Sequence, residues 1–149
     1  MIAIGSDHAG YNLKKIIINY LQENNYEVKD VGTYGTESAD YPDYGLAVAE
    51  AVRSGECDKG IIICGTGIGI SIAANKVTGI RAALCTNSLM AKLSRQHNDA
   101  NILALGERII GTELALDIVD TWIKTEFLDG RHESRVKKIS DIEQKYINR

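Results

Sequence analysis

A cysteine separates β-branched residues from alternating glycines: Ile61–Ile63 precede Cys64, and Gly65, Gly67 and Gly69 follow it. Consecutive isoleucines are typical of a strand buried on both faces, whereas glycine favours a tight turn. Apolar residues at helical spacing come next, so the segment predicts a strand, a turn and a helix. Such a turn leaves backbone N–H groups unpaired at a helix N-terminus, where they hold an anion or a developing oxyanion. We therefore expect an enzyme that stabilises negative charge on a small substrate.

The thiol of Cys64 has two interpretations. A free cysteine usually fills space in a core, which is the interpretation we give to Cys57 and Cys85. Cys64 differs by position, because a helix N-terminus and a ring of amides favour the thiolate form of a cysteine. We expect a chemical role for Cys64, either as a nucleophile or as a general base.

The glycine spacing argues against a nucleotide cofactor. Gly65-x-Gly67-x-Gly69 departs from the dinucleotide pattern G-x-G-x-x-G, and residues 82–87 lack the acid expected about 20 positions later. No Gly-Lys-Ser/Thr sequence closes the loop as in a P-loop. An oxyanion or phosphate nest is favoured, a purely structural turn is the alternative, and no cofactor is expected.

Acidic and imidazole side chains stand at two other element ends. Asp7 and His8 follow the first predicted strand, and His97 closes a predicted helix. Asp7 has a structural alternative as a helix cap, and His97 as a cation near the negative end of a helix dipole. The histidines and cysteines lack the short spacing of a metal-ligand set, so no metal is expected.

Two arginines suit a phosphate group. Arg131 and Arg135 lie four residues apart and share a face if a helix begins at the first of them. Two guanidinium groups on one face hold a phosphate through paired hydrogen bonds. The alternative is a solvated face on which Glu133 neutralises them. Arg108, just after the fifth predicted strand, is a third candidate.

Strands and helices alternate along the chain. Strands are expected at residues 1–5, 26–31, 59–64, 79–84 and 102–106, and helices after the glycine loop and at 9–24, 42–54, 88–97, 111–124 and 134–148. This order predicts an α/β fold: one three-layer α/β/α domain over 1–149, with a five-stranded parallel Rossmann-like sheet and an extra C-terminal helix.

Ligands in such folds bind outside the carboxyl ends of the strands. We therefore expect Asp7, the glycine loop and Arg108 to meet at one edge of the sheet, and we place His97 and Asn98 there as well. The last predicted helix follows no further strand. Its narrow apolar stripe packs on its own domain or across a partner subunit, and we favour the partner; the stripe contains Val136, Ile139, Ile142 and Tyr146.

Composition excludes several classes of protein. A net charge of −3 without a basic cluster argues against nucleic-acid binding. No apolar run approaches the roughly 20 residues that span a bilayer, and no signal peptide is recognisable. Three cysteines without framework spacing suit a reducing compartment. A cytoplasmic protein without nucleic-acid or membrane partners is expected.

Four motifs then occur in order: GSDHAG at 5–10, DYPD at 40–43, CGTGIG at 64–69 and RQHNDAN at 95–101. Together they resemble the ribose-5-phosphate isomerase type B family, which includes galactose-6-phosphate and allose-6-phosphate isomerases. The resemblance covers essentially the whole chain. It implies an aldose–ketose isomerase of the pentose phosphate pathway that works without a metal through an enediolate. It also implies a homodimer or tetramer whose subunits share the active site.

The resemblance implies roles for the residues that do chemistry. Cys64 is the base that moves a proton between C2 and C1 of the sugar. The loop amides stabilise the enediolate oxygen, helped by the Thr66 hydroxyl; the loop comprises Gly65, Thr66, Gly67, Ile68 and Gly69. His97, assisted by Asp7, opens the furanose ring.

Substrate-binding roles are implied in the same way. Tyr41 and Asn98 contact sugar hydroxyls, and some phosphate ligands come from the second subunit; the phosphate ligands are His8, Arg108, Arg131 and Arg135. Some relatives use a glutamate base elsewhere, but the corresponding helix position here is Asn75, so the thiol version applies. The expected reaction converts D-ribose 5-phosphate to D-ribulose 5-phosphate. A hexose 6-phosphate (allose or galactose) substrate and a non-catalytic sugar-phosphate-binding module are the alternatives.

Overall fold

A five-stranded, all-parallel sheet forms the middle layer of the computed structural model, which describes residues 1–147. The strands are β1 (Ile2–Ser6), β2 (Val28–Asp30), β3 (Lys59–Cys64), β4 (Ala82–Leu84) and β5 (Ile102–Gly106), in the order β2-β1-β3-β5-β4. The three central strands are almost wholly buried, as their continuous apolar runs require. Ser6 pairs with Ile63, and Cys64 with Gly106, so the loops after these strands lie side by side.

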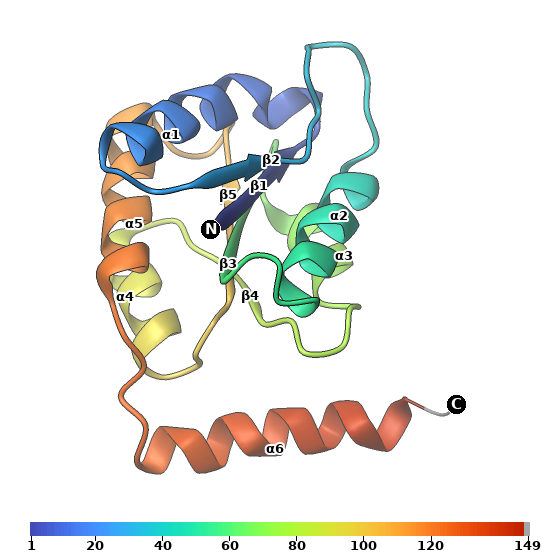
Figure 1. The fold of residues 1–149 in the computed structure, drawn as a ribbon, viewed down its shortest axis with the longest axis vertical. Helices are drawn as coiled ribbons and strands as arrows, with labels where there is room; N and C mark the ends of the chain where they lie inside the picture. Colours follow the sequence, from blue (N-terminus) through green and yellow to red (C-terminus); the bar gives the residue numbers. More distant parts are fainter. Residues whose placement is uncertain (148–149) are drawn as a thin grey trace.

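Helices cover both faces of the sheet (Figure 1). One face carries α1 (Tyr11–Glu23), α4 (Ser88–Gln96) and α5 (Thr112–Lys124), and the other carries α2 (Tyr41–Arg53) and α3 (Ile68–Ala74). A short 3₁₀ turn, η1 (His8–Gly10), precedes α1, and a last helix, α6 (Arg131–Tyr146), follows α5. The predicted α/β fold with its parallel sheet and extra C-terminal helix is confirmed.

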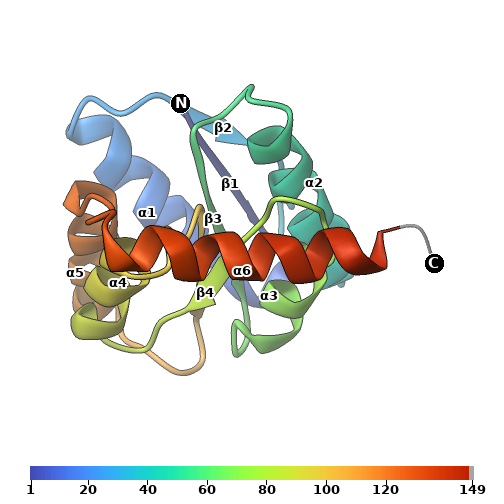
Figure 2. The same cartoon turned by 90° about the horizontal axis from the view of Figure 1, so that it is seen from below.

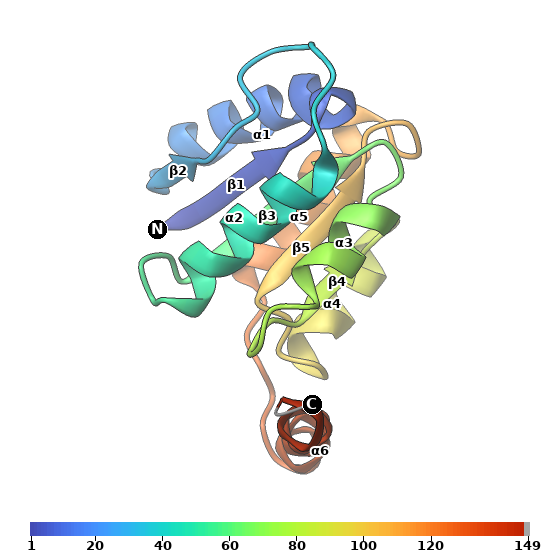
Figure 3. The same ribbon diagram turned by 90° about the vertical axis from the view of Figure 1, so that its right-hand side faces the viewer.

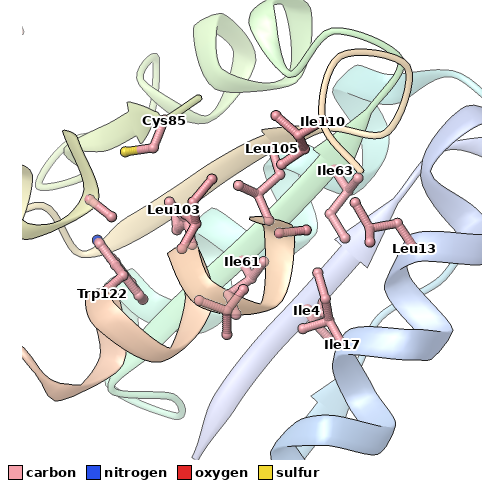
Figure 4. Close-up of a cluster of buried hydrophobic side chains, with 14 of the residues drawn as sticks. Ile4, Leu13, Ile17, Ile61, Ile63, Cys85, Leu103, Leu105, Ile110 and Trp122 are labelled. Atoms are coloured by element: carbon pink, nitrogen blue, oxygen red, sulfur yellow. The ribbon is translucent and has the colours of Figure 1, made fainter. Parts of the chain in front are cut away.

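Alternating residues of the strands divide the interior into two cores. Ile61 and Ile63 of β3 face α1 and α5, where they pack with Leu103 and Trp122 (Figure 4). Ile62 and Cys64 belong to the other core, beneath α2 and α3. The pleat of β3 therefore turns the Cys64 thiol toward the face of the sheet that α2 and α3 cover.

Helix α6 lies apart from the three layers, across the edge of the sheet at which β4 and β5 begin (Figures 2 and 3). His132 is its one buried residue, whereas Ile139 and Ile142 on its apolar stripe are exposed. The Glu143 carboxylate ties it to the body, accepting from Gly79 N at 3.0 and 3.1 Å. Within residues 1–147 no helix combines the length and apolar character needed to cross a membrane.

The helix predicted over 9–24 is interrupted at its start. Asp7 Oδ1 accepts from Ala9 N at 3.0 Å and from Gly10 N at 3.1 Å, which caps the separate turn η1. Gly10 lies against β3 so closely that a Cβ there would fall 2.6 Å from the carbonyl oxygen of Ile63. This tight approach explains why α1 begins only at Tyr11.

Other bounds differ modestly from the expected ones. Helix α6 begins at Arg131, three residues early, because Gly130 in a positive-φ conformation ends the predicted loop; the predicted helix end at Asn148 lies outside the described residues. The edge strands β2 and β4 are shorter than predicted. Asn87 caps α4, its Oδ1 accepting from Met90 N at 2.8 Å.

Candidate active site

Cys64 lies in a pocket of about 230 Å³ at the carboxyl end of the sheet. The lining residues are Asp7, His8, Ala9, Tyr41, Cys64, Gly65, Thr66, Gly69 and Arg108. They lie at the end of β3, in the segments that follow β1, β3 and β5, and at the starts of α2 and α3. The chain leaves β1 toward β2 on one side and returns to β3 on the other, and open α/β sheets bind ligands at such a switch point. The predicted meeting of Asp7, the glycine loop and Arg108 is thus present in one chain.

The thiol is buried and held by the loop that follows it. Cys64 is 4% exposed, and its Sγ accepts from Gly67 N at 3.1 Å. Gly67 has a left-handed φ of 78°, a conformation that favours glycine. The loop thereby directs a backbone N–H at the sulfur.

Thr66 sits at the mouth of the loop. Its Oγ1 accepts from Ile68 N at 3.2 Å, which leaves the hydroxyl hydrogen for a ligand. Gly69, on the next turn, lies under the ring of Tyr41, where a Cβ would fall 2.7 Å from ring carbons. A larger residue there would displace Tyr41 from the pocket wall.

The loop after β5 supports the glycine loop and adds a cation. Glu107 N donates to Cys64 O, and Arg108 N donates to Gly65 O, both at 3.0 Å. The Arg108 guanidinium lies over Gly65, with Nη1 only 3.1 Å from where a Cβ of Gly65 would stand. A positive charge therefore faces the loop in which negative charge is expected.

His8 is oriented by the loop before α2. Its Nδ1 lies 3.1 Å from the donating Ala39 N and 3.2 Å from Ala39 O. Nε2 is the ring nitrogen that remains for a ligand. His8 therefore presents a fixed imidazole to the pocket, as its predicted phosphate-binding role requires.

A second pocket, of about 270 Å³, lies between the end of α4 and α6. Its lining residues are His97, Asn98, Arg131, His132, Arg135, Val136 and Ile139. Because α6 begins at Arg131, Arg131 and Arg135 occupy adjacent turns of one helical face, as their spacing predicts. This pocket shares no lining residue with the Cys64 pocket.

The prediction that His97 and Asn98 join Cys64 at one edge is wrong for a single chain. A crossover helix runs back against the strands, so the carboxyl end of α4 lies at the edge where strands begin. Cys64 pairs with the last residue of β5, whereas His97 precedes the first, and a strand of that length spans about 13 Å. The predicted help from Asp7 to His97 is therefore absent within one chain.

Two buried or half-buried arginines shape the turn that carries His97 and Asn98. Arg95 donates to the Asp99 carboxylate at 2.9 Å and to Ala100 O at 2.7 Å. Arg81 Nε donates to Asn98 O at 3.0 Å and Arg81 Nη2 to Asp99 O at 2.9 Å. These bonds hold Asp99 at a left-handed φ of 47°, a conformation uncommon for a residue with a side chain.

His132 is a site residue that sequence reasoning did not find. Its ring stacks on that of His97, with centroids 4.2 Å apart and an interplanar angle of 11°. Burial, His97 and the charges of Arg131 and Arg135 lower the pKa of His132 below its ordinary 6.5. No periodicity links two histidines on different elements, so only tertiary structure brings them together.

Among residues 1–147, no three His, Cys, Asp or Glu side chains gather as a metal-ligand set. The arrangement instead offers a thiol, a loop of amides and several fixed cations. These groups suit proton transfer beside a carbonyl in a phosphorylated substrate.

Comparison with known proteins agrees with this chemistry. The family model described as Ribose/Galactose Isomerase matches residues 2–139. Ribose-5-phosphate isomerase B of Escherichia coli is 54% identical over 144 residues, 97% of each chain. The structure of ribose-5-phosphate isomerase B from Clostridium thermocellum is 71% identical, with a TM-score of 0.97 and 97% and 98% coverage of the two chains.

A further solved structure includes a sugar phosphate. Ribose-5-phosphate isomerase B from Mycoplasma genitalium, with bound ribulose-5-phosphate, is 43% identical, with a TM-score of 0.91 and coverage of 96% and 95%. The predicted resemblance and the predicted isomerase class are confirmed by these matches. The chain belongs to the ribose/galactose isomerase family.

Proposed function

We propose that this protein interconverts D-ribose 5-phosphate and D-ribulose 5-phosphate. The observation that carries the proposal is the Cys64 pocket, in which the thiol accepts a loop N–H beside Thr66 and Arg108. Relatives support the substrate, since the E. coli protein is named ribose-5-phosphate isomerase B and the M. genitalium structure has bound ribulose-5-phosphate. Residues 1–149 act as one domain in this proposal. The three unpaired cysteines of the chain suit the reducing conditions of the cytoplasm.

Cys64 acts as the base. Its thiolate removes the proton from C2 of the open-chain aldose, and the electron pair moves through C1 onto the carbonyl oxygen to form an enediolate. The loop amides and the Thr66 hydroxyl stabilise the charge on that oxygen. The proton returns to C1, and the proton of the C2 hydroxyl passes to O1 as C2 becomes a carbonyl, so no external oxidant or reductant is consumed.

We propose that a second copy of the chain completes each site. The Cys64 pocket has the base but lacks the arginine pair, whereas the other pocket has two arginines and two histidines but no thiol. In a dimer with two-fold symmetry, the Cys64 pocket of each subunit faces the arginine-containing pocket of its partner. The symmetry creates two such joined sites. Each half then supplies what the other lacks.

Exposed apolar side chains support this pairing. Ile68 and Ile72 of α3 are 52% and 56% exposed, although their spacing is what predicts the helix. Ile139 and Ile142 of α6 are 47% and 62% exposed. Apolar surface of this kind beside both pockets suits burial against another subunit.

In the joined site, Arg131 and Arg135 of one subunit hold the phosphate together with His8 and Arg108 of the other. His97 opens the furanose ring, and Asn98 and Tyr41 contact the sugar hydroxyls. The phosphate is remote from the reacting carbons, so its binding energy orients the chain of carbons over Cys64.

The first test is activity in the presence of a chelator. The purified protein is incubated with ribose 5-phosphate, allose 6-phosphate or galactose 6-phosphate, and ketose formation is measured. Rapid turnover of the pentose supports the proposal, and turnover of a hexose alone moves the substrate while keeping the mechanism. Binding of all three without turnover would make the protein a sugar-phosphate-binding module.

A further inference from the structure

His97 and His132 form a face-to-face pair at the edge of the second pocket. Their ring centroids are 4.2 Å apart and their planes differ by 11°. We infer that His132 is a positioning residue that holds the His97 imidazole in the orientation required for sugar ring opening. This inference rests on the proposed function, in which His97 opens the ring.

The burial of His132 is unusual for its helix. It is 8% exposed, while Arg131 and Glu133 on either side are exposed and the isoleucines of the helix face solvent. Neither imidazole forms a hydrogen bond with another residue of the described chain. The ring contact of His132 within the described chain is with the face of His97, an arrangement that aromatic rings favour.

Main-chain hydrogen bonds hold together the two backbone segments that carry these rings. Leu128 N donates to Gln96 O at 3.2 Å, immediately before His97 in the chain. His132 N donates to Asp129 O at 3.1 Å, which closes the turn that begins α6. The connection between α5 and α6 is thereby attached to the end of α4, and the stack does not depend on the rings alone.

The charge state of His132 suits this task. Its charged neighbours are Arg131 and Arg135 on its own helix, and the facing titratable group is His97 at the end of α4. These groups and burial lower the pKa of His132, so it is neutral at neutral pH. A neutral aromatic face accommodates His97 both as the free base and as the imidazolium that forms when it takes a proton.

Ring opening requires His97 to take up one proton and to deliver another. The C1–O4 bond breaks, the anomeric hydroxyl loses its proton as C1 becomes the aldehyde, and O4 gains a proton. A histidine that both removes and delivers protons must keep its ring edge aimed at the sugar oxygens. A ring free to rotate about its side-chain bonds would spend less time in that geometry.

The substrate pair provides a test that separates ring opening from isomerisation. Ribose 5-phosphate is cyclic and must open, whereas ribulose 5-phosphate is open-chain because its C5 oxygen carries the phosphate. Solvent deuterium exchange at C1 of ribulose 5-phosphate therefore requires Cys64 but no ring opening. Conversion of ribose 5-phosphate requires both.

Two variants of the full-length protein are compared with wild type. His132→Leu removes the aromatic face at similar volume, and His132→Phe keeps it. We expect His132→Leu to lower kcat/KM for ribose 5-phosphate by at least about tenfold with deuterium exchange unchanged, and His132→Phe to restore most of the loss. Lys137→Ala, an exposed change on the same helix, should alter neither rate.

The inference is overturned if His132→Leu lowers both rates equally, if it lowers neither, or if the phenylalanine variant behaves like the leucine variant. Thermal unfolding checks that each variant is folded, and the phenylalanine comparison stays decisive if leucine destabilises the protein. Inactive wild type with every sugar phosphate would instead contradict the proposed function.

Discussion

Cys64 lies at the end of the sheet where the strands finish, and His97 lies at the opposite end, where the strands begin. Cys64 ends β3 beside the last residue of β5, and His97 ends α4 before the first residue of β5. In the proposed mechanism the base and the ring-opening group act on the same sugar. The two groups line separate pockets of one chain, so the proposal requires a second copy.

Heterodimers test this relationship directly. Cys64→Ala and His97→Asn subunits with different tags are co-expressed, and the doubly tagged species is isolated. Each homodimer should be inactive, whereas the heterodimer should recover about half of the wild-type activity, because one of its two sites combines an intact Cys64 with an intact His97. An inactive heterodimer would show that each site is built within one chain.

Replacing Cys64 tests the base. Cys64→Ala should lower kcat by about 10²–10⁴-fold and change substrate affinity only a few-fold, because it removes a proton-transfer group. Affinity is measured by calorimetry and rate by ketose formation. Cys57→Ala, a matched change at a buried cysteine of the same core, should retain activity. Equal losses of binding and rate at Cys64 would count against the base assignment.

Replacing Arg135 tests the phosphate site. Arg135→Ala should raise KM by about 10–100-fold, because it removes charge-assisted hydrogen bonds, with a smaller effect on kcat. Lys137→Ala removes a positive charge from another face of α6, where Lys137 pairs with Asp141 at 3.1 Å, and should leave KM unchanged. An unchanged KM in the Arg135 variant removes that residue from the site.

Local sequence patterns predicted the features of this molecule that depend on residues close together in the chain. The isoleucine run before Cys64 marks a buried strand, and alternating glycines mark the turn that follows. The spacing of Arg131 and Arg135 gave their shared face. Cys64, Asp7 and Arg108 were correctly brought together because the ends of neighbouring parallel strands must meet.

The positions of His97 and His132 depend on tertiary structure, not on local sequence patterns. The prediction that His97 joins Cys64 is wrong within one chain, because residues at the end of a crossover helix return to the end of the sheet where the strands begin. The stack of His97 on His132 depends on a turn attached to the end of α4. Such contacts arise from tertiary packing, which no spacing along the chain encodes.

A glycine contact predicts the cost of disturbing the loop. A Cβ at Gly106 would lie 2.5 Å from the carbonyl carbon and oxygen of Thr66. Gly106→Ala should therefore lower the free energy of unfolding by about 1–3 kcal/mol and also reduce kcat/KM, because the displaced backbone belongs to the loop beside Cys64. Urea unfolding and the isomerase assay measure the two effects.

Gly111→Ala is the matched control for that variant. Gly111 has a φ of −77°, and nothing lies within 4 Å of a Cβ placed there. Gly111 is the N-cap residue of α5, where alanine is less favourable than glycine, so its substitution should lower the free energy of unfolding by less than about 1 kcal/mol and leave activity intact. Equal behaviour of the two alanine variants would contradict the argument from the Thr66 contact.

The neutral state of His132 predicts a pH dependence of stability. Burial and the positive charges of its neighbours lower its pKa in the folded protein, whereas the unfolded chain keeps a value near 6.5. Below that pH the unfolded state binds a proton that the folded state resists, so the free energy of unfolding falls as the pH falls. The contribution is complete above pH 6.5 and is lost on acidification toward the lower folded-state pKa.

Urea unfolding on both sides of pH 6.5, at one fixed protein concentration, measures this dependence. His132→Phe keeps the aromatic face but cannot take a proton, so its stability should decline less than that of wild type on acidification. Lys137→Ala, which removes no group that titrates in this range, should decline in parallel with wild type. Parallel decline in the phenylalanine variant as well would mean that His132 binds its proton equally in the folded and unfolded states.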